Sequence, residues 1–338
     1  MSSLSTPLRL GIVGAGLRGQ MFGHAVQGMP GVEIVGACDP SDGPRSGFAR
    51  AFGTPEFSDH RDLLAAGIDA AIVATPDFAH RTPAVDLASA GVHLLVEKPL
   101  ATTVADAEDI VQAVRSGGAQ GFVGFENRWA NTFSALAARS HNGDFGRLRS
   151  LSLRLNNSRS VPLRMLSWAE RSTPAWFLMP HALDMALWLS GQEVASVTAR
   201  ATRGVLDGLG VHTYDTVHAL LTLRDGAIVS LESTWALPDD LPSIVDYKVH
   251  LVGEKARATV DHEDQMMRID LDRHSLPRTL GSHRAGADQG PAPWMARSFV
   301  RRLQGLDEDL PTVEHGLVVT RVIAAIHESA EDGSTIAL

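Results

Sequence analysis

The chain has 338 residues, about twice the length of a typical domain, so two domains are expected. Its 39 acidic residues outnumber its 30 basic ones, for a formal charge of −9, and no apolar run reaches the ~18 residues that cross a bilayer, so neither nucleic acid nor a membrane is an expected partner. The single cysteine, Cys38, excludes a disulfide framework and a zinc site of several thiolates. The N-terminus lacks a basic segment followed by an apolar core, so we expect a cytoplasmic protein.

The first part of the chain alternates short apolar strands with helical segments. Strands are predicted at 8–13, 33–39, 70–75, 92–97 and 121–125. Helices are predicted between them, from the end of the first strand to about 29 and at 44–52, 59–66, 79–90 and 104–116. Strands that are apolar throughout and alternate with helices indicate a parallel sheet covered on both faces.

After about residue 146 the apolar residues recur at every second position. This alternation predicts strands at 147–156, 194–203, 216–223, 228–235 and 245–252, with hairpin turns at 224–227 and 253–256. A surface loop at 275–293 and helices near 294–305 and 314–332 complete the chain. We therefore predict an α/β fold, with a doubly wound parallel sheet in residues 1–126. An α+β domain with a large, mostly antiparallel, open-faced sheet follows in 127–338, its closing helices packing back on the N-terminal domain.

Glycines follow the first strand in the pattern Gly14-Ala-Gly16-Leu-Arg-Gly19. Gly14 permits a tight turn, Gly16 lets the backbone approach a pyrophosphate, and Gly19 lets helix and strand pack closely. The pyrophosphate would then lie at the N-terminus of a helix, where free N–H groups favour an anion. The motif in this strand–helix context predicts a Rossmann-type dinucleotide site; the alternative is a glycine-rich turn without a ligand.

Asp39 lies 20 residues beyond Gly19, at the end of the second strand. A carboxylate there accepts hydrogen bonds from a ribose diol and repels a 2′-phosphate, so the sequence favours NAD over NADP. Arg18 and Arg45 could bind a 2′-phosphate, which keeps NADP as the minor alternative.

Two later segments carry a family resemblance. Thr75-Pro-Asp-Phe-Ala-His80 followed by Glu97-Lys98-Pro99 resembles the glucose–fructose oxidoreductase, inositol dehydrogenase and MocA family, and the similarity continues through His181-Ala-Leu-Asp184 to the last helix. The resemblance implies an NAD-dependent oxidoreductase acting on a CH–OH group of a sugar, an inositol or a related cyclic polyol. It also implies an NAD-binding domain in 1–126 and a substrate and oligomerisation domain in 127–338. The cofactor-binding residues that it implies, together with the glycine motif, are Gly14, Ala15, Gly16, Leu17, Arg18, Asp39, Thr75, Pro76, His80, Glu97 and Lys98. Without it, Thr75-Pro76 would be a strand-ending turn and His80 a helix cap.

Lys98 terminates an apolar strand, where a charged amine is costly unless it has a partner or a task. Partial burial and a nearby nicotinamide cation would both lower its pKa. Lysine shifts its pKa readily, so Lys98 is the predicted proton acceptor. The alternative is a surface lysine paired with Glu97.

His181 and Asp184 lie three residues apart on a helix predicted from about Thr173 through Leu189, and so share a face. The resemblance implies that His181 passes the substrate's hydroxyl proton and that Asp184 contacts the substrate or supports the site. The alternative is a surface pair or a core histidine satisfied by Asp184. No metal is expected, since further ligands are not apparent.

Phe177 stands where many dehydrogenases of this family carry an aspartate, four residues before the histidine. Either Lys98 and His181 suffice, another acid such as Glu170 or Asp184 substitutes, or the chemistry has changed. The departure motivates two alternative functions: a non-catalytic or sensor-type NAD-binding protein, and an enzyme that modifies sugars with tightly held NAD in a redox-neutral reaction.

Further polar and aromatic residues are candidates for substrate contacts. Arg128 would bind a sugar hydroxyl or pair with Glu126, and Trp168, Trp176 and Trp235 would stack on a sugar or lie in the core. The apolar residues of the second sheet are expected to be divided between its two faces, which predicts a homodimer or homotetramer through this sheet. These residues are Leu151, Leu153, Leu221, Leu223, Leu231 and Val249.

Overall fold

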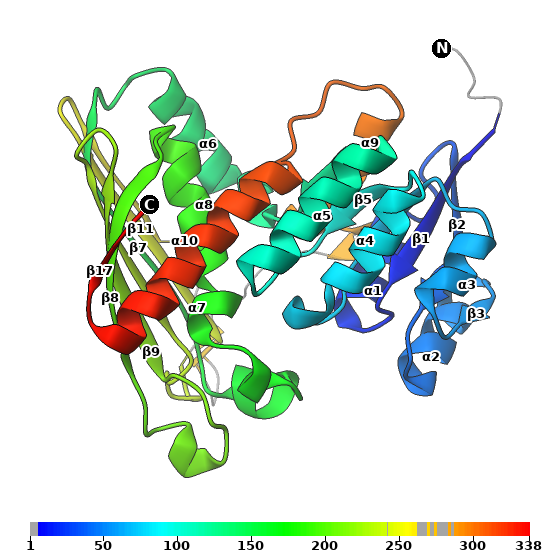
Figure 1. Cartoon of the computed structure of the whole chain (residues 1–338), viewed down its shortest axis with the longest axis horizontal. Helices are drawn as coiled ribbons and strands as arrows, with labels where there is room; N and C mark the ends of the chain where they lie inside the picture. The colour runs from blue at the N-terminus through cyan, green and yellow to red at the C-terminus, as the bar shows by residue number, and fades with distance from the viewer. Residues whose placement is uncertain (1–5, 242, 262–268, 271–273, 276–282, 285–286) are drawn as a thin grey trace. The chain divides into compact units, whose positions relative to one another are not determined.

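The structure is a computed structural model of the chain, and it describes residues 6–241, 243–261, 269–270, 274–275, 283–284 and 287–338 (Figure 1). The chain divides into two compact units. The first comprises Met1–Trp129 and Leu280–Val318, and the second comprises Ala130–Thr279 and Val319–Leu338. Within the described residues, none of the helices combines the length and the apolar character needed to span a membrane.

The first unit contains the predicted parallel sheet. Its strands pair in the order β3-β2-β1-β4-β5-β6, all parallel. They are β1 (Leu8–Val13), β2 (Val32–Cys38), β3 (Glu56–Phe57), β4 (Ala70–Val73), β5 (His93–Val96) and β6 (Gly121–Val123). The two-residue strand β3 was not predicted, because it is too short to show a periodicity. The order reverses between β1 and β4, so ligands are expected at the carboxyl ends of these strands.

Helices cover both faces of this sheet. They are α1 (Leu17–Val26), α2 (Asp42–Phe52), α3 (His60–Ala65), α4 (Arg81–Ser89), α5 (Val104–Gly117) and α9 (Pro291–Leu303), with 3-10 turns η1 (Asp77–Ala79) and η2 (Glu126–Trp129). One buried cluster joins Phe22 of α1, Phe48 of α2 and Phe299 of α9, while α4 contacts both α3 and α5. Thr103 caps α5 by accepting the Asp106 N–H, at 3.1 Å.

Two short strand pairs lie before and within the segment 275–293 that was predicted as a surface loop. They are β13 (Ile269–Asp270) with β14 (His274–Ser275), and β15 (His283–Arg284) with β16 (Ala287–Asp288). The helix after them, α9, begins three residues earlier than predicted and packs against α1 and η2. Residues 276–282 and 285–286 of the predicted loop lie outside the described residues.

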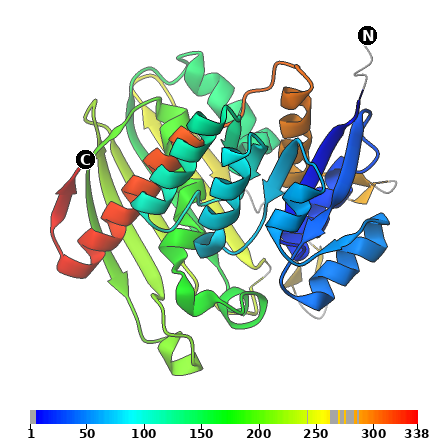
Figure 2. The same cartoon turned by 45° about the vertical axis from the view of Figure 1, so that its right-hand side comes forward.

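The second unit is built on a seven-stranded sheet in the order β12-β11-β7-β10-β9-β8-β17. The strands are β7 (Leu148–Asn157), β8 (Val194–Thr202), β9 (Thr216–Leu223), β10 (Ile228–Thr234), β11 (Val245–Gly253), β12 (Arg257–Asp261) and β17 (Thr335–Ala337). Only β7 and β10 pair in parallel, so the sheet is mostly antiparallel, as predicted. The C-terminal strand β17, red in Figure 2, forms one edge.

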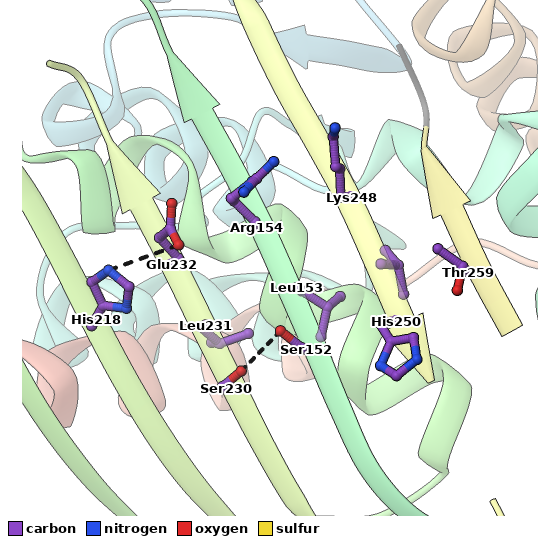
Figure 3. Close-up of a pocket in the computed structure, with 11 residues that line it drawn as sticks. Ser152, Leu153, Arg154, His218, Ser230, Leu231, Glu232, Lys248, His250 and Thr259 are labelled. Carbon is purple, nitrogen blue, oxygen red and sulfur yellow. Dashed lines mark hydrogen bonds and ion pairs between the residues drawn. The ribbon is translucent and has the colours of Figure 1, made fainter. Parts of the chain in front are cut away.

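The apolar residues of this sheet were expected to be divided between two faces, and that expectation was wrong. All six are buried: Leu151, Leu153, Leu221, Leu223, Leu231 and Val249. The register makes them cross-strand neighbours on one face, with Leu151 opposite both Val229 and Leu251, because side chains alternate with period two. The opposite face exposes Leu220 and Ile228 and has a hollow that is lined largely by polar side chains (Figure 3). It is lined by Ser152, Arg154, His218, Ser230, Glu232, Lys248 and His250.

The predicted helix from 173 to 189 is two helices, α7 (Pro174–Phe177) and α8 (Met179–Ser190). Pro180 explains the break, because proline lacks an N–H and its ring clashes with the carbonyl four residues earlier. Helix α8 packs on β7 and β10. The remaining helical segments are α6 (Asn131–His141), η3 (Val161–Met165), η4 (Ala169–Arg171), η5 (Asp207–Leu209) and α10 (Val313–Asp332), which contains the division point at Val318.

Candidate cofactor and active site

The three motif glycines of the first unit have different surroundings. Gly14 has φ +94°, and a Cβ there would lie 2.7 Å from the Ala74 carbonyl oxygen. A Cβ on Gly19 would lie 1.9 Å from the carbonyl oxygen of Gly14, so only glycine lets α1 approach the turn. A Cβ on Gly16 would meet none of the described atoms within 4 Å. The outer two glycines therefore serve packing, and the central one borders open space.

The N-terminus of α1 begins beside that open space. Gly16 is its N-cap and has no capping side chain, and the first turn carries no acidic residue. Ala15 is buried, whereas the Leu17 side chain is 81% exposed. N–H groups at such a helix end are oriented toward an anion, so the loop fits the diphosphate of a dinucleotide.

Asp39 lies directly after β2 and contacts this loop. Its Oδ2 accepts the Ala15 N–H at 3.0 Å, and its Oδ1 accepts the Ser41 N–H at 2.9 Å. Arg45 pairs with Asp42 and, at 3.3 Å, with Glu56. The carboxylate thus lies where a ribose diol would be held, and the Arg45 guanidinium is already bound by two carboxylates.

His80 joins the loops that follow β4 and β5. The Nδ1 atom of its ring lies 2.8 Å from the Pro99 carbonyl oxygen, and Nε2 lies 3.0 Å from the Thr75 carbonyl oxygen. The residue is 1% exposed, and its side chain does not cap α4. His80 therefore braces the loops that contain Pro76 and Lys98. The Thr75 hydroxyl is buried with no hydrogen-bond partner among the described residues, which leaves a polar atom at this strand end for a ligand.

Lys98 follows β5, beside the buried carboxylate of Glu97, and its peptide bond to Pro99 is cis. The Lys98 N–H donates to Glu97 Oε2 at 3.1 Å. Burial lowers the pKa of the Lys98 amine below its ordinary value, and Arg18 lowers it further, against the opposing effects of Glu97, Glu126 and Asp77. An amine in this state is suited to accept a proton.

Arg18, predicted to contact the cofactor, binds two carboxylates of the protein in this structure. Its Nε donates to Glu97 Oε1 at 2.7 Å, and its Nη2 pairs with Glu126. Burial by itself would lower the pKa of Arg18, but Glu126 and Glu97 raise it above its ordinary value. Glu126 was considered only as a partner of Arg128. The position of Glu126 after β6 could have predicted this contact, because β6 lies beside β5, the strand that Glu97 follows.

Arg128 lies in η2 and has its Nη2 3.1 Å from Nε2 of His315. The His315 ring also meets the Phe125 ring edge-on, with centroids 5.6 Å apart. Next to it, Trp129 donates its indole N–H to the Ser298 hydroxyl at 3.0 Å. Glu126, which the sequence offered as a partner of Arg128, binds Arg18.

In the second unit, His181 lies in the first turn of α8 and is half-buried. Asp184 is only 1% exposed. Burial raises the pKa of the Tyr247 hydroxyl, and the Asp184 carboxylate raises it further, so these two groups are close. Asp184 therefore faces the covered side of the sheet near β11. In this position it can help to fix α8, the helix that carries His181.

Aromatic rings surround Phe177. Its centroid lies 6.0 Å from the half-buried Trp168 ring and 5.6 Å from the Trp235 ring, which is fully buried and belongs to the core. An aspartate at this position would face two indoles. Glu170, one of the two predicted substitutes, accepts the His212 N–H at 3.0 Å, and Asp184, the other, is buried.

His327 was not predicted from the sequence to have a role of its own. Its ring stacks on Trp176, with centroids 4.9 Å apart and an interplanar angle of 17°. Nε2 lies 2.8 Å from the Thr173 hydroxyl, and Thr173 accepts the Trp176 N–H as the N-cap of α7. Burial lowers the pKa of His327, so a neutral imidazole that accepts from Thr173 fits this position.

The described residues contain no group of three or more histidine, cysteine, aspartate or glutamate side chains placed to hold a metal ion.

Comparisons with known proteins place this arrangement in context. Residues 8–125 match the family model described as "Oxidoreductase family, NAD-binding Rossmann fold", and residues 133–259 match "GFO/IDH/MocA C-terminal domain". D-glucoside 3-dehydrogenase of Escherichia coli is 25% identical over 99% of this chain and 98% of its own. Myo-inositol dehydrogenase Hyg17 of Streptomyces leeuwenhoekii is 28% identical over 73% of this chain and 75% of its own. The WlbA dehydrogenase of Bordetella pertussis, solved with NADH and UDP-GlcNAcA, has a TM-score of 0.81 and 27% identity over 98% of this chain and 99% of that chain.

Proposed function

Because this chain belongs to the glucose–fructose oxidoreductase, inositol dehydrogenase and MocA family of NAD-binding oxidoreductases, we propose that it is an NAD-dependent dehydrogenase of a sugar, an inositol or a related cyclic polyol. The observation that carries the proposal is Lys98, an amine of lowered pKa at the carboxyl end of a strand in the dinucleotide-binding sheet. The substrate class is supported by relatives named as dehydrogenases of a glucoside and of myo-inositol.

The cofactor would be held by the loop from Gly14 to Leu17, with Asp39 on a ribose and Thr75 just after β4. When bound, NAD supplies the hydride acceptor. His80 and Glu97 would act indirectly, because both bind groups of the protein itself.

We assign the proton to Lys98. Its burial disfavours the ammonium form, so the amine accepts the hydroxyl proton during oxidation and returns it during reduction. His181 is the second proton-handling group on the family pattern. Trp168, half-buried beside Phe177, offers a ring face for the apolar side of a sugar. Asp184 supports the helix of His181 from beneath, and Arg128 is a candidate for a substrate hydroxyl.

The proposed division of labour gives residues 1–126 to NAD and residues 127–338 to the substrate and to self-association. A homodimer or homotetramer would form through the open face of the second sheet. That face carries both signs of charge, since His218 lies near Glu232 (Figure 3) and Lys248 pairs with Asp261 at 2.9 Å. A second copy could therefore meet it by complementary charges. Light scattering at several salt concentrations measures the oligomeric state and its dependence on these charges. We further propose a cytoplasmic location.

The proposed function is tested by incubating the protein and NAD with a panel of sugars and inositols and following NADH absorbance. NADH formation with at least one of them supports a dehydrogenase. Cofactor that survives purification, together with conversion of a sugar derivative without net NADH, would support the redox-neutral alternative suggested by Phe177. Binding of NAD without any turnover would support a sensor.

Replacing Gly16 with alanine should weaken NAD binding without affecting the fold. The added methyl group meets no described atom, and the backbone φ of −68° suits any residue. The methyl group would fill the space a diphosphate needs, so we expect the dissociation constant to rise roughly tenfold, or about 1.4 kcal/mol. Fluorescence titration measures this, with urea unfolding as the control. Unchanged NAD affinity would contradict the assignment of this loop.

Replacing His181 with alanine should lower the turnover number by roughly a hundredfold or somewhat less, at or below the lower limit of what a general acid–base group contributes. We expect less than for Lys98, because His181 is the second group in the proposed proton path. Steady-state kinetics of the variant and of His141→Ala, a surface histidine on α6, measure the difference. Equal losses in both variants would remove His181 from the reaction.

A further inference from the structure

Arg18 brings together three segments that are distant in sequence. Its Nε donates to Glu97 Oε1, 79 residues away, and its Nη2 pairs with Glu126, 108 residues away. Its guanidinium carbon lies 5.0 Å from the centre of the Phe22 ring, one turn further along α1. The Arg18 side chain therefore links the start of α1 to the residue after β5 and to η2.

Glu97 connects this contact to Lys98. One oxygen of its carboxylate binds Arg18, and the other accepts the Lys98 N–H. The Glu97 and Glu126 side chains are only 9% and 17% exposed, so water screens them weakly and each requires a cation nearby.

We propose that Arg18 is a positioning residue for Lys98: by binding Glu97 and Glu126, it holds the loop after β5 in place and keeps the two carboxylates from stabilising the ammonium form of the lysine. The inference rests on the proposed role of Lys98 as a proton acceptor. The charges around the amine act in the required directions. Burial and Arg18 lower the pKa of Lys98, whereas Glu97, Glu126 and Asp77 raise it.

This role differs from the cofactor contact that the sequence suggested for Arg18. A guanidinium that binds a phosphate must keep its N–H groups for it, but Arg18 directs Nε and Nη2 to carboxylates. Removing Arg18 should therefore change the state of Lys98 while NAD affinity stays within about threefold, a difference below 1 kcal/mol.

The chain is well suited to a direct measurement, because Lys98, Lys248 and Lys255 are its only three lysines. Trace acetylation of amines, quantified by peptide mass spectrometry over a range of pH, gives the titration midpoint of each lysine without any substrate. Lys248 and Lys255 lie on the second sheet and its hairpin and act as internal references. In Arg18→Met we expect the Lys98 midpoint to rise by on the order of 1 pH unit, with the two references unchanged.

Two further variants test the cause. In the double variant Arg18→Met with Glu126→Gln, one positive and one negative charge are removed, so the Lys98 midpoint should return toward that of the parent. Glu126→Gln alone should lower the midpoint, because it removes a carboxylate that favours the ammonium form. Arg81→Met is the matched control, since Arg81 also pairs with two carboxylates, Asp106 and Asp109, between α4 and α5.

A folded Arg18→Met protein with the parental Lys98 midpoint would overturn the inference, and so would an equal shift in Arg81→Met. If Arg18→Met does not fold, as judged by circular dichroism, Glu126→Gln and Arg18→Lys decide the matter; the lysine keeps the charge but cannot fork to both carboxylates, so a smaller rise is expected. Because acetylation needs no turnover, this result is independent of whether Lys98→Ala abolishes activity. That outcome tests the proposed function separately.

Discussion

Replacing Lys98 with alanine should lower the turnover number by about 10²- to 10⁴-fold, the usual contribution of a positioned proton acceptor. The amine lies at the end of β5 with its pKa lowered by burial, and alanine leaves no group there to take the hydroxyl proton. NAD affinity should be retained, because the glycine loop and Asp39 are untouched. Steady-state kinetics with the best substrate of the panel measure the first effect, and fluorescence titration with NAD measures the second.

Two variants control for charge and for the loss of any lysine. Lys98→Arg keeps a cation at the position, but arginine does not deprotonate near neutral pH, so it should be as inactive as the alanine variant. Lys248→Ala removes an exposed lysine of β11 and should leave turnover unchanged. Full activity in Lys98→Ala would remove this residue from the mechanism, and activity in Lys98→Arg would show that only the charge matters.

Replacing Gly19 with alanine should destabilise the protein by about 3 kcal/mol or more and abolish NAD binding. The new Cβ would lie 1.9 Å from the carbonyl oxygen of Gly14, which is backbone and cannot rotate away. Helix α1 would have to move off the turn, and the N–H groups at its start would move with it. Urea unfolding followed by circular dichroism measures the free energy of unfolding, and titration measures NAD affinity.

A second helical glycine of the same unit provides the comparison. Among the described residues, a Cβ on Gly47 of α2 would meet the Gln20 side chain alone within 4 Å, at an ordinary 3.7 Å. Gly47→Ala should therefore stabilise the protein by about 0.5–1 kcal/mol, because alanine favours the helix and restricts the unfolded chain. A Gly19→Ala protein as stable as Gly47→Ala would show that α1 and the turn are not packed as described.

The local features of the candidate site follow from residues close in sequence. Gly14, Gly16 and Gly19 lie within six positions, and Asp39 ends the strand that follows, so motif and periodicity together predicted the strand–turn–helix unit and the preference for NAD. The same holds for Lys98, because an ionisable side chain at the end of an apolar strand is visible in the sequence. The alternation in the second half likewise predicted a mostly antiparallel sheet.

Long-range pairing was decided only by the tertiary structure. Arg18 binds carboxylates 79 and 108 residues away, and the His80 ring lies between the carbonyl oxygens of Thr75 and Pro99; neither set of partners was predicted from the sequence. The sequence also did not show which residues form the covered face of the second sheet. Alternation assigns the residues of one strand to two faces, but it does not say which residues of different strands lie on the same face. Strand register placed Leu151 and its neighbours on the same side.

The sequence by itself therefore predicted most of the strands and helices and indicated where a dinucleotide and a proton acceptor would bind, because these predictions depend on periodicity and on motifs a few residues long. It did not predict β3, α6, β17 or the break between α7 and α8. The partners of each charged side chain depend on which strand ends become neighbours. The order β1-β4-β5-β6 brings Lys98, Glu97 and Glu126 together. That order is set only when the whole sheet is assembled, because successive parallel strands are joined through helices and do not pair as local hairpins.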